Sequence, residues 1–198
     1  MTQAAVGWHG KLPSVSDFAA RRLDPAFIEL WDAALSASLA ALRDGAGERW
    51  TDVYLASPTW RFVAGPGFLP PPFDATGWTG LVMPSVDRVG RYYPLTLALP
   101  LDLDTASTPA VWHWLGELED AAYAALQEDW PIERLEAELE RLGGPPAAGT
   151  PPAPGEAAAL QGCSRWCRQM ESGPAAVLRA SSLEEAFAAL WSASEVPT

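Results

Sequence analysis

Two apolar runs on either side of a four-residue turn constrain this fold more than any other sequence feature. Residues 78–86 (WTGLVMPSV) and 91–101 (RYYPLTLALPL) are rich in Val, Leu and Tyr, and an Asp-Arg-Val-Gly turn at 87–90 joins them. Such runs are typical of buried strands, and glycine at the end of the turn accepts the positive φ angle of a tight hairpin. The stretch therefore predicts adjacent antiparallel strands over 79–86 and 91–99. We expect their buried side chains to include Leu81, Met83, Leu95 and Leu97.

Periodic apolar residues predict helices between groups of strands. Residues 16–45 show an apolar stripe at three- and four-residue spacing, with Asp24-Pro25 as an N-cap followed by a first-turn proline and Ser16 capping a short turn before it. Gly45 is expected to end this helix. Shorter helices are expected at 109–128, 131–142 and 183–193, the first and last capped by Thr108 and Ser182. The inward residues of the second helix should be Val111, Trp112, Leu115, Leu118, Ala122 and Leu126.

The remaining segments complete a sheet within one domain. Short strands are expected at 4–9 and 59–65, and a second hairpin at 163–170 and 175–181. A Gly/Pro/Ala-rich linker near 143–158 is expected to lack fixed structure inside the domain. At 198 residues the chain predicts a single domain, 1–198. Its fold class is α/β in the α+β sense: a mostly antiparallel central sheet of about five strands, flanked by helices.

Charge and composition exclude several partners. The formal net charge is −12, which repels phosphate backbones and anionic lipid surfaces, so neither nucleic acid nor a membrane surface is expected. The first residues lack a basic segment followed by an apolar core, and no apolar run reaches the roughly 20 residues of a membrane-spanning helix. We expect a soluble protein of the cytoplasm.

Catalytic and metal-binding patterns are weak. No phosphate-binding loop, zinc-protease motif or nucleophile-elbow motif occurs in the sequence. A small hydrolase built on Ser85, Asp87 and His9 or His113 is the alternative that the residues leave open. Cys163 and Cys167 could join the histidines around zinc, but in a strand they lie about 13 Å apart, so we expect no metal and no cofactor. Two buried apolar thiols are the simpler interpretation.

The stability of the hairpin does not explain the two arginines in its turn. A hairpin needs Asp87 and Gly90, but it does not need Arg88 and Arg91. Surface ion pairs contribute only about 0–1 kcal/mol, whereas arginine offers planar, bidentate donors to a carboxylate or phosphate of a partner. From the residues alone, internal pairing and partner recognition both remain open.

Two long motifs carry a resemblance. "GWHGKLPSVSDFAARRL" at 7–23 and "PSVDRVGRYYPL" at 84–95, with "WDAAL" and "YLASPTWRF" between them, resemble the TagF (ImpM) family of type VI secretion system-associated proteins. The resemblance is strong over about 6–101 and looser beyond. It implies a sandwich resembling longin or profilin-type domains and a non-enzymatic, post-translational repressor of type VI secretion. The implied partner is the forkhead-associated (Fha) scaffold protein. After the linker, Trp166-Cys167 stands where the family would place an aromatic pair.

We therefore expect a composite partner-binding surface. Gly7, Gly10 and Pro13 should form a turn that brings Trp8 and Lys11 near the 87–91 turn. We expect Asp87 to be structural and at least one arginine to face the partner. Trp8 fits a core position and an interface anchor equally well. A structural accessory subunit of the secretion apparatus is a further alternative, and a homo-oligomer is possible. The expected surface comprises Trp8, Lys11, Asp17 and Arg22, the last two on the first helix, with Ser85, Asp87, Arg88 and Arg91.

Overall fold

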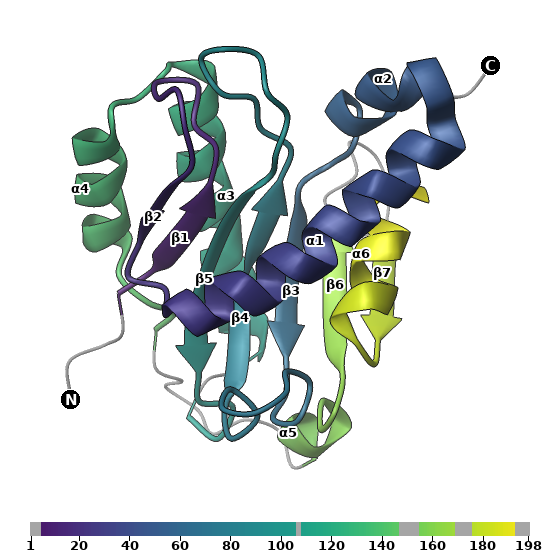
Figure 1. The fold of residues 1–198 in the computed structure, drawn as a ribbon. Coiled ribbons are helices and arrows are strands. Elements are labelled where there is room, and N and C mark those ends of the chain that lie inside the picture. The colour runs from purple at the N-terminus through teal and green to yellow at the C-terminus, as the bar shows by residue number, and fades with distance from the viewer. Residues whose placement is uncertain (1–4, 106–107, 147–154, 169–175, 193–198) are drawn as a thin grey trace.

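The architecture is one open sheet with helices on both faces. The computed structural model describes residues 5–105, 108–146, 155–168 and 176–192. Seven strands in this part of the chain pair antiparallel in the order β2-β1-β5-β4-β3-β6-β7 (Figure 1). The strands are β1 Gly7–Gly10, β2 Ala19–Arg21, β3 Trp60–Ala64, β4 Gly77–Met83, β5 Leu95–Leu101, β6 Ser164–Arg168 and β7 Ala176–Ala180.

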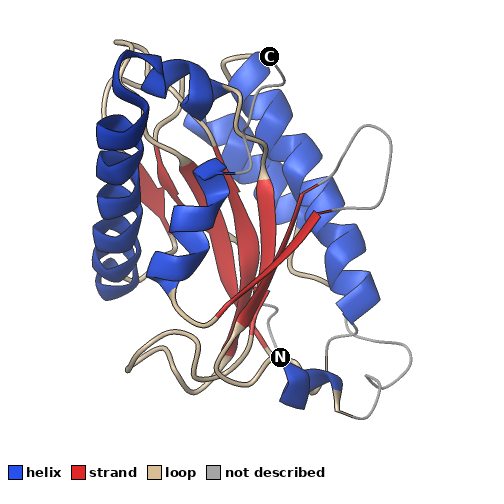
Figure 2. Cartoon of the chain, turned by 90° about the vertical axis from the view of Figure 1, so that its right-hand side faces the viewer, coloured by secondary structure: helices blue, strands red, loops and turns tan. Residues whose placement is uncertain are grey.

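The helices form two layers around the sheet. In Figure 1, α1 crosses the front of the sheet diagonally and α6 lies beside it, while α3 and α4 lie behind; Figure 2 shows the same layers edge-on. The helices are α1 Pro25–Ala46, α2 Trp50–Leu55, α3 Thr108–Gln127, α4 Ile132–Leu142, α5 Glu156–Ala159 and α6 Leu183–Ser192, and a short 3₁₀ turn, η1 Gly47–Arg49, joins α1 to α2.

Each face of the sheet has its own hydrophobic core. Leu81 and Leu97 pack with α3 and α4 on one face. Trp31, Phe62 and Trp166 pack with α6 on the other face. Every residue of β4 is therefore buried, because both of its faces are covered. This double coverage explains why β4 does not alternate between apolar and polar residues; its one polar side chain, Thr79, donates to the Phe62 carbonyl.

The predicted pairing of the two central strands is confirmed, but their ends were wrong. Leu81 lies opposite Leu97 and Met83 lies opposite Leu95, and all four are buried. However, β4 ends at Met83 and β5 begins at Leu95, and between them only an isolated bridge joins Val86 to Tyr92. Prolines 84 and 94 occupy the two exit points. Because proline cannot donate a ladder hydrogen bond, residues 84–94 leave the sheet as a broad loop.

The segment before α1 is the main correction to the predicted helices. Residues 19–21 pair with β1 as an edge strand, so the helix predicted from residue 16 begins at Pro25. Asp24 is extended and caps the helix by accepting from the Ala26 amide at 2.8 Å, as residues before proline favour. Ser16 is therefore not a cap. The helix also ends later than predicted, at Ala46, and is followed by the C-cap Gly47 with its φ angle of 55°.

The sheet has more strands than the sequence suggested. The prediction was about five strands, whereas the described residues form seven: each of the six predicted strand segments is present, and β2, which was assigned to a helix, is the seventh. The predicted linker is also partly ordered: Glu156–Ala159 forms α5, while residues 147–154 lie outside the described residues.

The other helices follow the predicted ranges closely. The Ser182 hydroxyl caps α6 by accepting from the Glu185 amide at 3.2 Å. In α3, Trp112 and Leu126 are only half-buried, whereas Trp114 and Ala125 are buried in their place. The side chain of Thr108 and the predicted 171–174 turn lie outside the described residues.

The apolar character of the first helix has a structural explanation. The run Pro25–Leu55 is the one helical stretch of the described residues that is long and apolar enough to cross a membrane, and it lies near the N-terminus. Its apolar side chains Phe27, Trp31, Leu35 and Leu39 are buried in the core beneath it. Packing of these side chains against the sheet therefore accounts for part of this hydropathy.

Substitution of Gly80 tests the tight approach of the central strands. A Cβ atom on Gly80 would lie 2.0 Å from the Leu97 carbonyl oxygen, so Gly80→Ala must separate β4 from β5. We expect the free energy of unfolding to fall by roughly 3 kcal/mol, measured by urea denaturation.

Gly45→Ala is the matched control for this substitution. A Cβ atom at this helical position meets nothing within 4 Å, so this variant should gain about 0.5–1 kcal/mol through better helix propensity. Equal stabilities of the two variants would contradict the packing that we describe.

Candidate functional site

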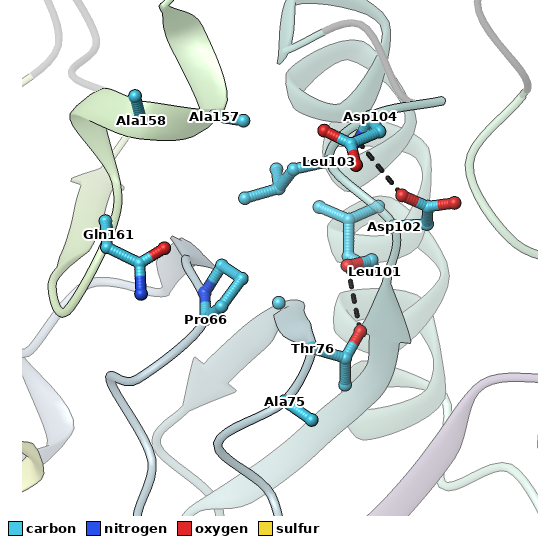
Figure 3. Close-up of a pocket in the computed structure, with 11 residues that line it drawn as sticks. Pro66, Ala75, Thr76, Leu101, Asp102, Leu103, Asp104, Ala157, Ala158 and Gln161 are labelled. Carbon is cyan, nitrogen blue, oxygen red and sulfur yellow. Dashed lines mark hydrogen bonds between the residues drawn. The ribbon is translucent and has the colours of Figure 1, made fainter.

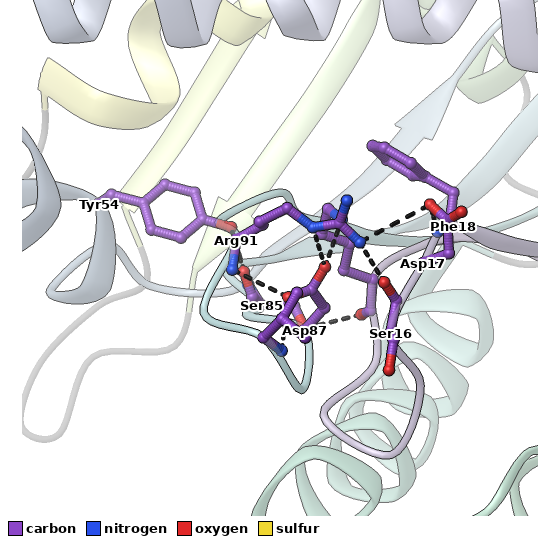
Figure 4. A network of polar contacts seen from close by, with 9 residues as sticks. Ser16, Asp17, Phe18, Tyr54, Ser85, Asp87 and Arg91 are labelled. Carbon is purple, nitrogen blue, oxygen red and sulfur yellow. Dashed lines mark hydrogen bonds and ion pairs between the residues drawn. The ribbon is translucent and has the colours of Figure 1, made fainter.

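Asp87 is the centre of a polar cluster within the 84–94 loop (Figure 4). Its side chain is fully buried. Its Oδ2 accepts hydrogen bonds from Lys11 Nζ at 2.6 Å and from Arg91 Nε at 2.7 Å. Its Oδ1 accepts from the backbone amides of Val89 at 3.0 Å and Arg91 at 2.9 Å. One carboxylate thus holds both the turn and a lysine from a distant segment.

The backbone of the turn closes around the same residue. The Asp87 amide donates to the Arg91 carbonyl, and the Gly90 amide donates to the Asp87 carbonyl, both at 3.0 Å. Gly90 has a φ angle of 83°, which favours glycine at this position. The predicted roles of Asp87 and Gly90 in the turn are therefore confirmed, although the turn closes a loop and not a two-strand hairpin end.

The cluster stabilises the ionised form of Asp87. Burial opposes ionisation, but hydrogen bonds from Lys11, from Arg91 and from the Val89 amide outweigh it and hold the pKa of Asp87 well below its usual range. Lys11 is itself buried, and Asp87 is its one carboxylate partner among the described residues, whereas Asp87 also pairs with Arg91.

The opening segment is attached to the loop along its length. The Ser85 hydroxyl donates to the Lys11 carbonyl at 2.7 Å, and the Arg88 amide donates to the Val15 carbonyl at 3.0 Å. The Arg91 guanidinium also donates to the Ser16 carbonyl. The predicted contact of the Lys11 segment with the 87–91 turn is therefore confirmed.

A tyrosine on α2 supports the loop from the other side. Tyr54 Oη donates to the Ser85 carbonyl and accepts from the Ser85 amide, both at 2.9 Å. Burial raises the pKa of Tyr54, so its phenol remains protonated and can donate. The sequence carried no signal for this role, because Tyr54 lies in an ordinary short amphipathic helix.

Trp8 and Arg22 belong to a second cluster, so the expected single patch is divided. Residues 7–10 form strand β1 and not a turn, and Trp8 is fully buried. The Trp8 indole donates to Glu136 Oε1 on α4 at 2.6 Å, and Arg22 pairs with the same carboxylate. Trp8 is therefore a core residue and not an exposed anchor. Glu136 could not be found from sequence, because it lies 128 residues from Trp8.

The remaining predicted residues lie at the surface. Asp17 and Arg22 are not on a helix, since both precede Pro25. Asp17 is 83% exposed and its carboxylate lies 3.8 Å from Arg91. Arg88 is exposed, and within the described residues its side chain forms no hydrogen bond or ion pair. Arg88 and the 61% exposed Val89 thus form the outer tip of the loop.

The hydrolase alternative lacks an available nucleophile. Ser85 is buried and its hydroxyl already donates to the Lys11 carbonyl. His9 stacks on Phe18 with ring centroids 5.6 Å apart, and no hydrogen bond among the described residues joins it to Ser85. Neither His9 nor His113 forms a hydrogen bond with Ser85 in the described part of the chain, where the Ser85 hydroxyl is bonded to the Lys11 carbonyl.

No candidate metal centre is found in the described part of the chain. That part contains no group of three or more His, Cys, Asp or Glu side chains able to hold an ion. A pocket of about 260 Å³ lies where Asp102 and Asp104 follow β5, with Gln161 opposite (Figure 3). The Asp102 carboxylate there accepts from the Asp104 amide at 3.0 Å, so it serves a local turn.

Comparison with known proteins identifies the class and then the family. The model of the TagF N-terminal domain, described as type VI secretion system-associated, matches residues 7–142. The fold is similar to the crystal structure of PA0076 from Pseudomonas aeruginosa PAO1, with a TM-score of 0.77, 31% identity and 94% of each chain covered. Among curated proteins, none matches. The chain is thus an α+β protein associated with type VI secretion. It belongs to the TagF family.

Removal of Lys11 tests the buried ion pair. Lys11→Met leaves the buried Asp87 carboxylate with one cationic partner fewer, so the free energy of unfolding should fall by about 3 kcal/mol. Chemical denaturation measures this loss. Arg88→Ala is the control and should stay within about 0.5 kcal/mol of wild type. A Lys11→Met protein as stable as wild type would show that the pair contributes nothing.

Acid should weaken the same cluster. Because the folded pKa of Asp87 lies below the unfolded value of about 3.9, its contribution is complete above that value and is lost as pH falls towards the folded pKa. The stability difference between wild type and Asp87→Asn should therefore shrink below about pH 4. Urea unfolding at pH 6, 4 and 3 measures it. A difference that is independent of pH would refute this assignment.

Proposed function

We propose that this TagF-family protein is a non-enzymatic, post-translational repressor of a type VI secretion system in the bacterial cytoplasm. It acts by binding a partner protein, and the partner is the forkhead-associated (Fha) scaffold of that system. Family membership supports the association with type VI secretion. The lack of an available nucleophile at Ser85 favours binding over hydrolysis.

The observation that carries the proposal is the presentation of Arg88 on a rigid loop. Inside the loop, the Asp87 carboxylate accepts hydrogen bonds from Arg91 and Lys11. The Arg88 amide donates to the Val15 carbonyl, which attaches the opening segment to the loop. Arg88 and Val89 remain exposed at the tip. A fixed backbone reduces the ordering that binding requires, and a free guanidinium can donate bidentate hydrogen bonds to a carboxylate or phosphate.

The roles within the motif therefore differ. The loop is held in place by hydrogen bonds of Asp87, Lys11, Ser85 and Arg91. Arg88, in contrast, contacts the partner. Asp17, beside Arg91, lies at the rim of this surface. Trp8 and Arg22 act indirectly, because their contacts with Glu136 join α4 to β1 and to the turn before α1.

Arg88→Ala should abolish repression without unfolding the protein. Loss of a bidentate arginine at an interface costs about 2 kcal/mol, which weakens binding roughly thirtyfold. Cells that overproduce this variant should therefore release type VI substrates into the medium, whereas wild-type overproduction should block release. Circular dichroism and thermal melting should match wild type.

Arg49→Ala is the matched control, because Arg49 is also an exposed arginine but lies in η1. It should repress like wild type. Undiminished repression by Arg88→Ala would remove Arg88 from the site. A pull-down with the Fha scaffold should lose the partner in the same variant, whereas stoichiometric co-sedimentation with assembled sheath would favour a structural subunit.

A further inference from the structure

A second surface lies beside α1, on the face of β1 opposite Trp8. It is a groove of about 490 Å³, within the size range of ligand sites in proteins. Its α1 side carries residues spaced by about one turn, so that they share one helix face. His9, Phe18 and Tyr93 form its other side. The helix contributes Pro25, Ile28, Glu29, Asp32 and Ser36.

Asp32 is a carboxylate without a cation. Among the described carboxylates that are buried or half-buried, Asp87, Glu119, Glu136 and Glu138 each pair with lysine or arginine. Asp32 pairs with none of the described cations and accepts only from the Tyr93 hydroxyl, at 2.5 Å. The other four carboxylates each have a lysine or arginine partner, and Asp32 is the exception.

His9 also lacks a polar partner. It is only 9% exposed and lines the groove, yet its imidazole forms no hydrogen bond with the described residues. Burial lowers the pKa of His9, although the nearby Asp32 charge opposes this shift. At neutral pH the ring is therefore uncharged, and one of its nitrogens is an unused acceptor.

Glu29 adds a second negative charge on the same helix face. It stands three residues from Asp32, a spacing at which like charges repel each other. The groove is lined by no lysine or arginine, while the 47% exposed Phe18 and the half-buried Ile28 supply apolar walls. Lys11 lies over the Phe18 ring at 4.3 Å, but its ammonium is committed to Asp87.

We propose that this groove binds an arginine side chain of a partner protein. The guanidinium donates to the Asp32 and Glu29 carboxylates and to the neutral His9 ring, and the aliphatic stem packs against Phe18 and Ile28. Arginine fits better than lysine because its planar fork offers five donors in fixed directions to three separate acceptors. This surface differs from the Arg88 tip, and its test does not depend on repression of secretion.

Titration with small probes tests the groove directly. N-acetyl-arginine methylamide is added to the isotope-labelled protein, and amide chemical shifts are followed by NMR. We expect saturable shifts of His9, Asp32 and Ser36. The citrulline analogue has the same shape without the charge and should cause none. Asp32→Asn should weaken arginine binding about tenfold, the loss of one charge-assisted hydrogen bond.

Two further variants distinguish binding in the groove from a general attraction of the probe to the acidic protein. Glu29→Gln alters an exposed residue and should also weaken binding while the protein remains folded. Asp44→Asn removes an exposed carboxylate from the same helix, away from the groove, and should bind like wild type. Equal weakening by Asp44→Asn, or equal binding of citrulline or lysine analogues, would overturn the proposal. Self-association that the arginine probe reverses would instead place a second copy in the groove.

Discussion

The contact between Lys11 and Asp87 joins two segments that are 76 residues apart in sequence, and the site depends on it. A buried ion pair is costly unless both charges are fully hydrogen-bonded. Here the carboxylate accepts from two cationic side chains and two backbone amides, so its buried charge is satisfied. These hydrogen bonds, together with those from Ser85 and the Arg88 amide, hold the opening segment against the loop and give the loop its shape.

The sequence predicted this contact because its signals were local and unusual. Lys11 is the one lysine in the chain, and Asp87 and Gly90 are typical turn residues between apolar strands. The prediction failed where local preference and tertiary pairing disagree. Residues 19–21 (Ala-Ala-Arg) are good helix formers, yet they pair with β1 as a strand. Pro84 and Pro94 directly follow β4 and precede β5, and they are a sequence signal for the strand ends because proline cannot donate a ladder hydrogen bond.

Other parts of the site carry no sequence signal at all. Glu136 is one of several glutamates on an amphipathic helix, and only packing selects it as the partner of Trp8 and Arg22. Asp32 lies on α1, where its sequence neighbours do not show that its charge lacks a cationic partner. The roles of Glu136 and Asp32 become visible only in the folded structure, which shows which charged side chains have a partner of opposite charge and which do not.

The strand order has a consequence for how the chain folds during synthesis. Residues 7–9 of β1 pair with residues 96–98 of β5, and residues 61–64 of β3 pair with residues 164–167 of β6. The N-terminal strand therefore has no lateral partner in β5 until about half of the chain has been made. The edge of β3 that pairs with β6 lacks its partner for longer still, until residues 164–167 have been made. Pairings between such distant segments slow folding and leave strand edges open to wrong partners. The emerging chain therefore depends for its first lasting structure on α1 and on the local strand pairs β1–β2, β3–β4 and β4–β5.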